Sequence, residues 1–383
     1  MDSQTEINYD YRWMSNPQYW VSFSFGLISS AASLAGSLTV ITLVIKHRRW
    51  TSLYQRIMVG LSCMDVIMTS GIMIGPFAVL RETTLLSARG NTFTCDLSGF
   101  MILFWAASYT YNGILSFYFL LTIRYGVRET KASKYLEPWI HLFPIVVALT
   151  FGILSWAGKE FNPDTMYGIC DHSQFPPGCS KTDSCTRGVS KTQYRLALQF
   201  TVLSFVLLGI VCTWMVYWTV RQRTRRNLRH SSTSGLTNLQ TKRIQMVGMQ
   251  AVWYTLAFLN GFLVLLIPSI LSFSTKTKQA NTGWFTALLS IVYLLFPLEG
   301  FLNFLVYVRP DVARWRELNP TSSWPWAFRK ALSGASPSPQ PARLLHIHES
   351  DTHSVTEGQI DPPLGSGERG GNDDSPRLEC EES

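Results

Sequence analysis

The chain has 383 residues, of which 46% are hydrophobic and 13% aromatic, and its formal net charge is +8. Long apolar stretches alternate with short charged ones, which is typical of a multi-pass membrane protein. The length leaves room for one helix bundle and a tail, but not for a separate folded domain outside the membrane. An enzyme is not expected, because a zinc-dependent seven-helix hydrolase needs intramembrane histidines and only His141 lies within an apolar stretch. A nucleic-acid partner is not expected either.

Seven stretches have about the 20 residues that a helix needs to cross about 30 Å of hydrocarbon. They lack the alternation of barrel strands, so helices are the structure that satisfies their backbones in a bilayer. The sequence predicts an all-α membrane protein with a seven-transmembrane helix bundle over residues 20–308, preceded by a short head at residues 1–19. The expected spans are Trp20–Ile45, Ile57–Leu80, Leu97–Ile123, Pro138–Gly158, Leu196–Val220, Ile244–Leu271 and Trp284–Val308.

The loops between these spans differ in basic charge. Those that follow the first, third and fifth spans are richer in Lys and Arg than the alternate ones, and the loop at residues 221–243 has seven basic residues and no acid. Short cytosolic loops are enriched in Lys and Arg. We therefore expect a multi-pass protein of the plasma membrane with an extracellular N-terminus.

Four cysteines fall on the extracellular side in this topology: Cys95, Cys170, Cys179 and Cys185. An even number of cysteines in an oxidising compartment predicts two disulfides, and four cysteines allow three pairings. We favour Cys95–Cys170 with Cys179–Cys185, and the alternative is Cys95–Cys185 with Cys170–Cys179. A metal site is not expected, because His172 is the only nearby histidine.

Polar residues within a span are costly, so they are candidates for function. Asp65 lies midway along the second span, and Glu299 and Asn303 lie one helical turn apart on the seventh. Pro297 and Gly300 are expected to break the seventh helix. Asn112 is expected to donate an interhelical hydrogen bond.

The end of the chain divides into two expected parts. The sequence predicts a short amphipathic cytoplasmic helix over residues 309–318, because Pro310 is a favourable residue for the first turn of a helix. Residues 319–383 are rich in Pro, Gly, Ser and acids and are expected to be disordered. Serines and threonines lie among the acids of this tail, so it is a candidate substrate for a kinase. The phosphorylated tail would be a candidate binding site for an arrestin-like partner.

The seventh span resembles the Pro-x-x-Gly-Phe-x-Asn-x-x-x-Tyr signature of G-protein-coupled receptors of the cyclic-AMP-receptor and Git3-like group, within the secretin-like superfamily. The matching residues are Pro297, Gly300, Phe301, Asn303 and Tyr307, and Leu61, Ser62 and Asp65 are similar to the second-span pattern. Cys95 matches the family's third-span cysteine. Two features depart from related receptors: Ile123 stands where rhodopsin-like receptors have an acid before Arg124-Tyr125, and the sixth span lacks Cys-Trp-x-Pro.

The resemblance implies a receptor for an extracellular small molecule or peptide, in contact with membrane lipid and coupled to a heterotrimeric G protein. Asp65, Asn303, Glu299, Pro297, Gly300 and Tyr307 would take part in activation. The candidate coupling residues are Arg124, Tyr125, Arg128, Arg221, Arg223, Arg225 and Arg226. No cofactor is implied, and no ligand-binding residue can be assigned.

One other class of protein remains open from the sequence. A proton- or ion-coupled seven-helix transporter would use Asp65 and Glu299 as its proton carriers. A retinal-binding pump is excluded, because the seventh span has no lysine for the Schiff base.

Overall fold

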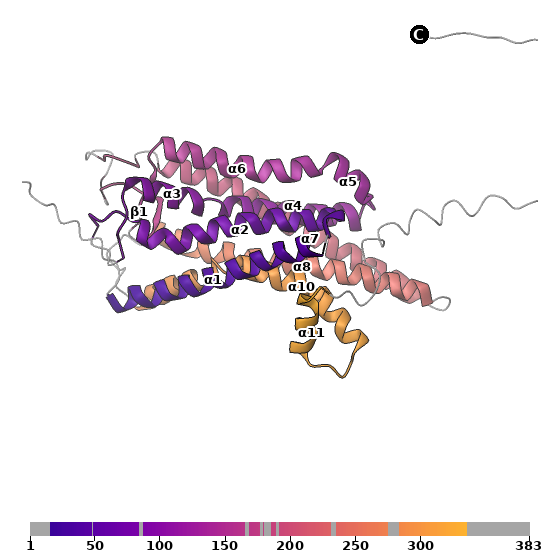
Figure 1. Cartoon of the computed structure of the whole chain (residues 1–383). Coiled ribbons are helices and arrows are strands. Elements are labelled where there is room, and N and C mark those ends of the chain that lie inside the picture. Colours follow the sequence, from indigo (N-terminus) through magenta and orange to yellow (C-terminus); the bar gives the residue numbers. More distant parts are fainter. Residues whose placement is uncertain are drawn as a thin grey trace, which may run out of the picture.

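The computed structural model describes residues 16–334 except for residues 48, 84–86, 165–167, 177–178, 180–184, 189–190, 231–234 and 275–282. The helices lie side by side in one elongated bundle (Figure 1). Their bounds are α1 Asn16–Lys46, η1 Arg49–Thr51, α2 Leu53–Ala78, α3 Thr92–Ile102, α4 Trp105–Ile123, α5 Glu129–Tyr135, α6 Glu137–Ala157, α7 Lys191–His230, α8 Gly235–Ser274, α9 Gly283–Leu295, α10 Glu299–Leu318 and α11 Trp324–Leu332. Two short antiparallel strands, β1 Phe161–Pro163 and β2 Cys170–His172, pair at one end.

Five of the described helices are long and apolar enough to cross a membrane: α1, α2, α6, α7 and α8. A sixth candidate span consists of α9 and α10, which meet at an angle of 47°. The chain is therefore an all-α, multi-pass membrane protein. Its two ends are referred to below as the disulfide end, where β1 and β2 lie, and the basic end, where α5 lies and toward which α7 and α8 project (Figure 1).

The expected third span is two helices rather than one. The chain turns at Leu103 and Phe104 between α3 and α4, and neither helix is apolar and long enough to count as a span alone. The middle of α4 is polar and buried, with Ser108, Thr110 and Asn112 each at most 1% exposed. Because α4 packs against α2, α6, α7 and α8, these groups meet protein rather than lipid.

The predicted break in the seventh span is confirmed at Pro297, whereas Gly300 does not break the helix but lies in the first turn of α10. Helix α9 ends at Leu295 and α10 begins at Glu299, so the turn contains Pro297. Proline lacks the N–H that the helix ladder needs, and it clashes with the preceding turn. Helix α10 closes the bundle by packing against α1, α2 and α8.

The expectations for the end of the chain need correction. Residues 309–318 are not a separate helix but the last part of α10, with Pro310 inside it. The expected disorder is wrong for Trp324–Leu332, which form α11. This helix is stabilised by burial of Ala327 and Ala331 in the bundle's hydrophobic core, and it has Pro325 in its first turn, where the missing N–H costs nothing. The remainder, residues 335–383, lies outside the described residues.

Candidate functional site

A cluster of buried polar side chains joins three helices in the middle of the bundle. Asp65 on α2 is fully buried and accepts two hydrogen bonds, from Ser108 Oγ at 2.6 Å and from Asn303 Nδ2 at 3.2 Å. Ser108 belongs to α4 and Asn303 to α10. The carboxylate of Asp65 therefore connects α2, α4 and α10, and both Asp65 and Asn303 are buried inside the bundle.

Glu299 extends this cluster by one helical turn. It is 1% exposed, and its Oε1 accepts a hydrogen bond of 2.8 Å from Asn112 Nδ2. The same amide group donates to the Ser108 carbonyl at 3.1 Å, so it links the two carboxylates through α4. Asn112 thus has the interhelical role that the sequence predicts. Within the described part of the chain, neither Asp65 nor Glu299 forms an ion pair.

Gly300, beside Glu299, brings α10 against α1. Its backbone N–H donates to Ser33 Oγ at 3.0 Å, and a Cβ built on Gly300 would lie 2.3 Å from Ser37 Oγ. On the other helix, a Cβ on Gly36 would lie 2.9 Å from the Phe301 Cα. The small residues of α1 and α10 thus allow backbone contact, as small residues do between membrane helices.

A second polar cluster lies closer to the basic end and consists of aromatic residues together with Gln250. Tyr54 on α2 shares a hydrogen bond of 2.7 Å with Tyr254 on α8, and Gln250 Nε2 donates to the Tyr54 hydroxyl at 2.6 Å. The ring of Tyr54 stacks on Tyr307 of α10 with centroids 6.3 Å apart, and Phe119 of α4 stacks on Tyr254 at 6.5 Å. This tyrosine cluster holds α8 against α2, α4 and α10.

The predicted coupling residues lie at the basic end but do not form one cluster. Arg124 is an exposed residue at the C-terminus of α4, where its Nη1 donates to Thr219 Oγ1 of α7 at 3.3 Å. Tyr125 is 61% exposed, and the exposed Arg128 precedes α5. Residues 221, 223, 225 and 226, all arginines, lie in the projecting part of α7, and the first three are exposed.

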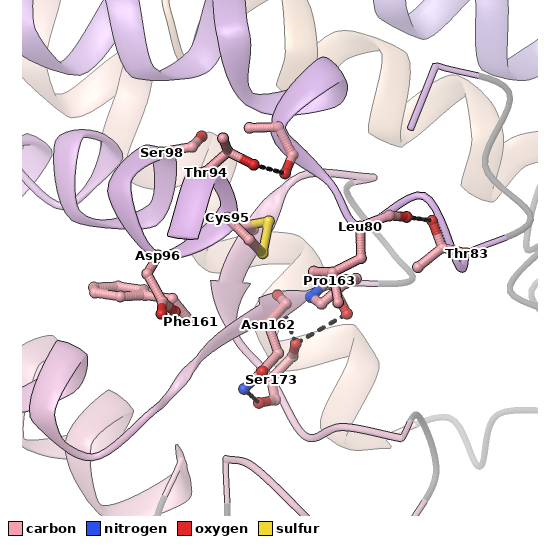
Figure 2. Close-up of a disulfide and its surroundings, with 12 residues drawn as sticks. Leu80, Thr83, Thr94, Cys95, Asp96, Ser98, Phe161, Asn162, Pro163 and Ser173 are labelled. Carbon is pink, nitrogen blue, oxygen red and sulfur yellow. Dashed lines mark hydrogen bonds between the residues drawn. A yellow bond between two sulfur atoms is a disulfide. The ribbon is translucent and has the colours of Figure 1, made fainter. Parts of the chain in front are cut away.

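The loop that covers the disulfide end is tied to α3. The predicted pairs Cys95–Cys170 and Cys179–Cys185 are both present, and Cys95 and Cys170 are fully buried. Figure 2 shows the first bridge between α3 and the strand pair. Ser173, just after β2, donates through its Oγ to the carbonyls of Asn162 at 2.9 Å and Pro163 at 3.0 Å, so β1 and β2 form one unit with the bridge.

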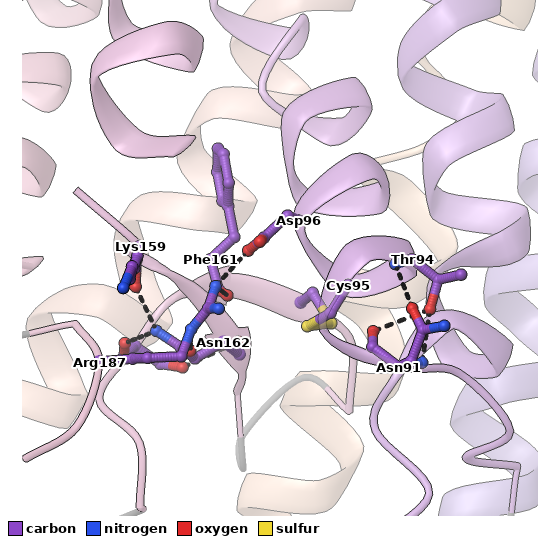
Figure 3. Close-up of polar contacts among 10 residues, drawn as sticks. Asn91, Thr94, Cys95, Asp96, Lys159, Phe161, Asn162 and Arg187 are labelled. Carbon is purple, nitrogen blue, oxygen red and sulfur yellow. Dashed lines mark hydrogen bonds and ion pairs between the residues drawn. A yellow bond between two sulfur atoms is a disulfide. The ribbon is translucent and has the colours of Figure 1, made fainter. Parts of the chain in front are cut away.

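An ion pair adds a second tie between this loop and α3. Arg187 Nη2 pairs with Asp96, the residue next to Cys95, and Arg187 Nε donates to Asn162 Oδ1 at 2.8 Å (Figure 3). Asn162 in turn donates through Nδ2 to the carbonyls of Lys159 at 3.0 Å and Ser173 at 2.8 Å.

The carboxyl group of Asp171 in β2 lies close to basic side chains. Burial acts to raise the pKa of Asp171, but the hydrogen bond and the charge of His172, together with the charge of Arg195, hold it below its usual range. The imidazole of His172 is almost fully buried and shares a hydrogen bond of 2.8 Å with Ser155 on α6. The loop is thus held by α3 and α6 together.

Sequence reasoning missed Ser108, Tyr54, Tyr254 and Gln250 as members of these clusters. Ser108 carried a signal, because it lies one turn before Asn112 on the same face of α4. The tyrosines carried none, since Tyr54 and Tyr254 are separated by 200 residues and an aromatic in a membrane helix is ordinary.

The comparisons with known proteins identify no family for this chain. No protein-family model matches it, and no curated protein sequence matches it.

Proposed function

We propose that this protein is a G-protein-coupled receptor that binds an unidentified extracellular small molecule or peptide and activates a heterotrimeric G protein. In this proposal α3 and α4 together form the third of seven spans, since their 11 and 19 residues give about 45 Å of helix. The disulfide end faces the outside of the plasma membrane, and the basic end faces the cytosol.

The observation that supports the proposal best is the tyrosine cluster at the basic end. Activation of a receptor requires a closed state that opens on the cytosolic side, and the opening needs contacts that break reversibly. Tyr254 attaches α8 to α2 by one hydroxyl–hydroxyl bond, Gln250 of α8 donates a second hydrogen bond to the same Tyr54 hydroxyl, and the other contacts are ring packing. Loss of these bonds would let the cytosolic part of α8 move outward.

The buried polar side chains Asp65, Asn112 and Glu299, here called the core cluster, give a route by which a ligand acts on the equilibrium between the closed and the open state. Asp65, Asn112 and Glu299 connect α2, α4 and α10, and the bend at Pro297 lies next to Glu299. A ligand under the loop of the disulfide end would favour the arrangement of α10 that it binds more tightly. The same shift would act on Tyr307, two turns further along α10, which stacks on Tyr54.

The test is nucleotide exchange on a panel of Gα subunits with the purified chain and with Tyr254→Phe. This substitution removes the hydroxyl but keeps the ring, so it removes about 1 kcal/mol from the closed state and raises ligand-free exchange roughly fivefold. Tyr54→Phe should act in the same direction. Tyr217→Phe, at a 46% exposed position on α7, is the matched control and should leave exchange unchanged.

Failure to stimulate exchange on every Gα subunit, by the wild type and by both variants, would contradict the receptor proposal. It would favour a proton- or ion-coupled transporter, the second candidate, which is motivated by two buried carboxylates that form no ion pair with any residue the structure describes. Proton flux into vesicles that is abolished by Asp65→Asn would then identify the transporter.

A further inference from the structure

Helix α11 carries basic and aromatic side chains that are exposed at the side of the bundle. Trp324, Trp326, Arg329 and Lys330, here called the α11 face, are all exposed. We propose that the α11 face binds the anionic headgroups of the lipid leaflet at the basic end. The inference uses the orientation proposed above only to say that this leaflet is the cytosolic one.

The apolar side of α11 is already covered by the bundle. Ala327 and Ala331 are at most 5% exposed, and the Phe328 ring meets Phe304 of α10 edge-on with centroids 6.0 Å apart. Trp326 meets the Trp315 ring of α10 edge-on with centroids 5.8 Å apart, yet it stays exposed like the other three residues of the α11 face. The exposed parts of these side chains can make a further contact without repacking.

The position of α11 fits the depth of lipid headgroups. Gly334, which follows the helix, lies against the ring of His47, and a Cβ built on Gly334 would be 1.8 Å from His47 Nε2. The first span ends at Lys46, the residue before His47. Figure 1 shows α11 beside the bundle rather than across its end, so its neighbour at this level is the surrounding bilayer.

The chemistry of the face also fits anionic lipid. Residues 309–332 include five basic and two acidic residues, a net charge of +3. Arg316 lies over the ring of Trp324 at 5.6 Å, and Lys330 lies over the ring of Trp326 at 5.8 Å. Tryptophan and long cationic side chains are the residues that prefer the boundary between hydrocarbon and water, and cations there attract negatively charged lipid. An acidic protein partner would not need the tryptophans at bilayer depth.

The test places an environment-sensitive fluorophore on Ser333→Cys, an exposed position one turn from Lys330, after Cys63, Cys212 and Cys380 are replaced by serine. The full-length protein is reconstituted in nanodiscs of phosphatidylcholine with 0 to about 40 mol% phosphatidylserine. We expect the emission to shift to the blue, and quenching by a soluble quencher to fall, as phosphatidylserine increases. Each cation near an anionic surface contributes about fivefold in binding, so Arg329→Gln with Lys330→Gln should require roughly 25-fold more phosphatidylserine and show no shift in this range.

The matched control is Arg221→Gln with Arg223→Gln, which removes the same charge from exposed positions on α7. It should keep the wild-type response. The proposal would be overturned if the emission in pure phosphatidylcholine equalled that with phosphatidylserine. It would also be overturned if the variant with Arg329→Gln and Lys330→Gln responded like the wild type. Displacement of the signal by a soluble acidic peptide at equal charge would overturn it in favour of a protein partner. None of these readings depends on G-protein coupling, and thermal unfolding of each variant checks that it is folded.

Discussion

Gly36 determines how closely α1 approaches α10. A methyl group at this position would lie 2.9 Å from the Cα of Phe301 and 3.1 Å from the carbonyl oxygen of Gly300, both backbone atoms that cannot move without shifting a helix. The contact lies directly beside Glu299 and so determines where the core cluster is held. A substitution here tests whether the described packing of α10 is the functional one.

We expect Gly36→Ala to lower the free energy of unfolding by about 1 to 3 kcal/mol, the usual cost of overpacking, and to alter nucleotide exchange with it. Thermal unfolding in detergent measures the first effect. Gly26→Ala is the matched control on the same helix, because its methyl would meet only the Tyr293 side chain, at 3.1 Å. Equal stability of the two variants would mean that α1 and α10 are further apart than described.

At the scale of single residues, the sequence singled out several polar groups of the buried cluster around Asp65, but not all of their partners. Asp65, Glu299 and Asn303 stood out because acids and amides are rare in apolar stretches. Ser108 and Asn112 join Asp65 and Glu299 into one cluster. This connection could not be predicted from the sequence, because the rotation of each helix about its axis depends on packing across the whole bundle.

The loop between α6 and α7 is the element whose order depends most on covalent links. The bridge Cys95–Cys170 joins residues 75 apart in sequence, whereas Cys179–Cys185 joins residues 6 apart. In the chain-entropy account, a disulfide stabilises by restricting the unfolded chain, and a longer closed loop gives more stabilisation. The first bridge also carries β2 to the side of α3.

We expect Cys95→Ser with Cys170→Ser to lower the free energy of unfolding by about 4 kcal/mol and to weaken ligand response, because the loop loses its tie to α3. Cys179→Ser with Cys185→Ser is the matched control and should cost about 2 kcal/mol. Thermal unfolding under non-reducing conditions ranks the two. A larger loss for the short ring would refute the view that the first bridge anchors the loop.

At the scale of elements, the sequence predicted helices where the apolar stretches are long and failed where packing decides. The bend at Pro297 followed from the chemistry of proline. The interruption at Leu103 and Phe104 did not, since these are ordinary apolar residues. Helix α11 was missed because the tail around it is polar, and its order comes from Ala327 and Ala331 packing into the bundle core.

At the scale of the whole molecule, the disulfides and the basic side chains of α7 lie at opposite ends. The disulfides and the strand pair lie at one end, and the projecting arginines of α7 lie at the other (Figure 1). At the basic end the helices are also joined by charge: Arg56 Nε on α2 pairs with Glu137 Oε1 on α6 at 2.5 Å, and its Nη2 with Oε2 at 2.8 Å. Arg221, Arg223 and Arg225 of α7 are exposed at the same end, and such a basic surface would suit the docking of an acidic partner.

Charge reversal tests that assignment of the two ends. Arg223→Glu, Arg225→Glu and Arg226→Glu together should reduce nucleotide exchange on the coupled Gα roughly tenfold at about 0.1 M salt, because electrostatic steering governs the association rate. The same reversal of Arg81, Arg89 and Lys159 changes the net charge equally at the disulfide end, where the three side chains are exposed, and should leave exchange intact. Equal losses in both triple variants would show that net charge matters rather than position. Full coupling after the α7 substitutions would place the docking surface elsewhere, with Arg124 and Tyr125 as the next residues to reverse or remove.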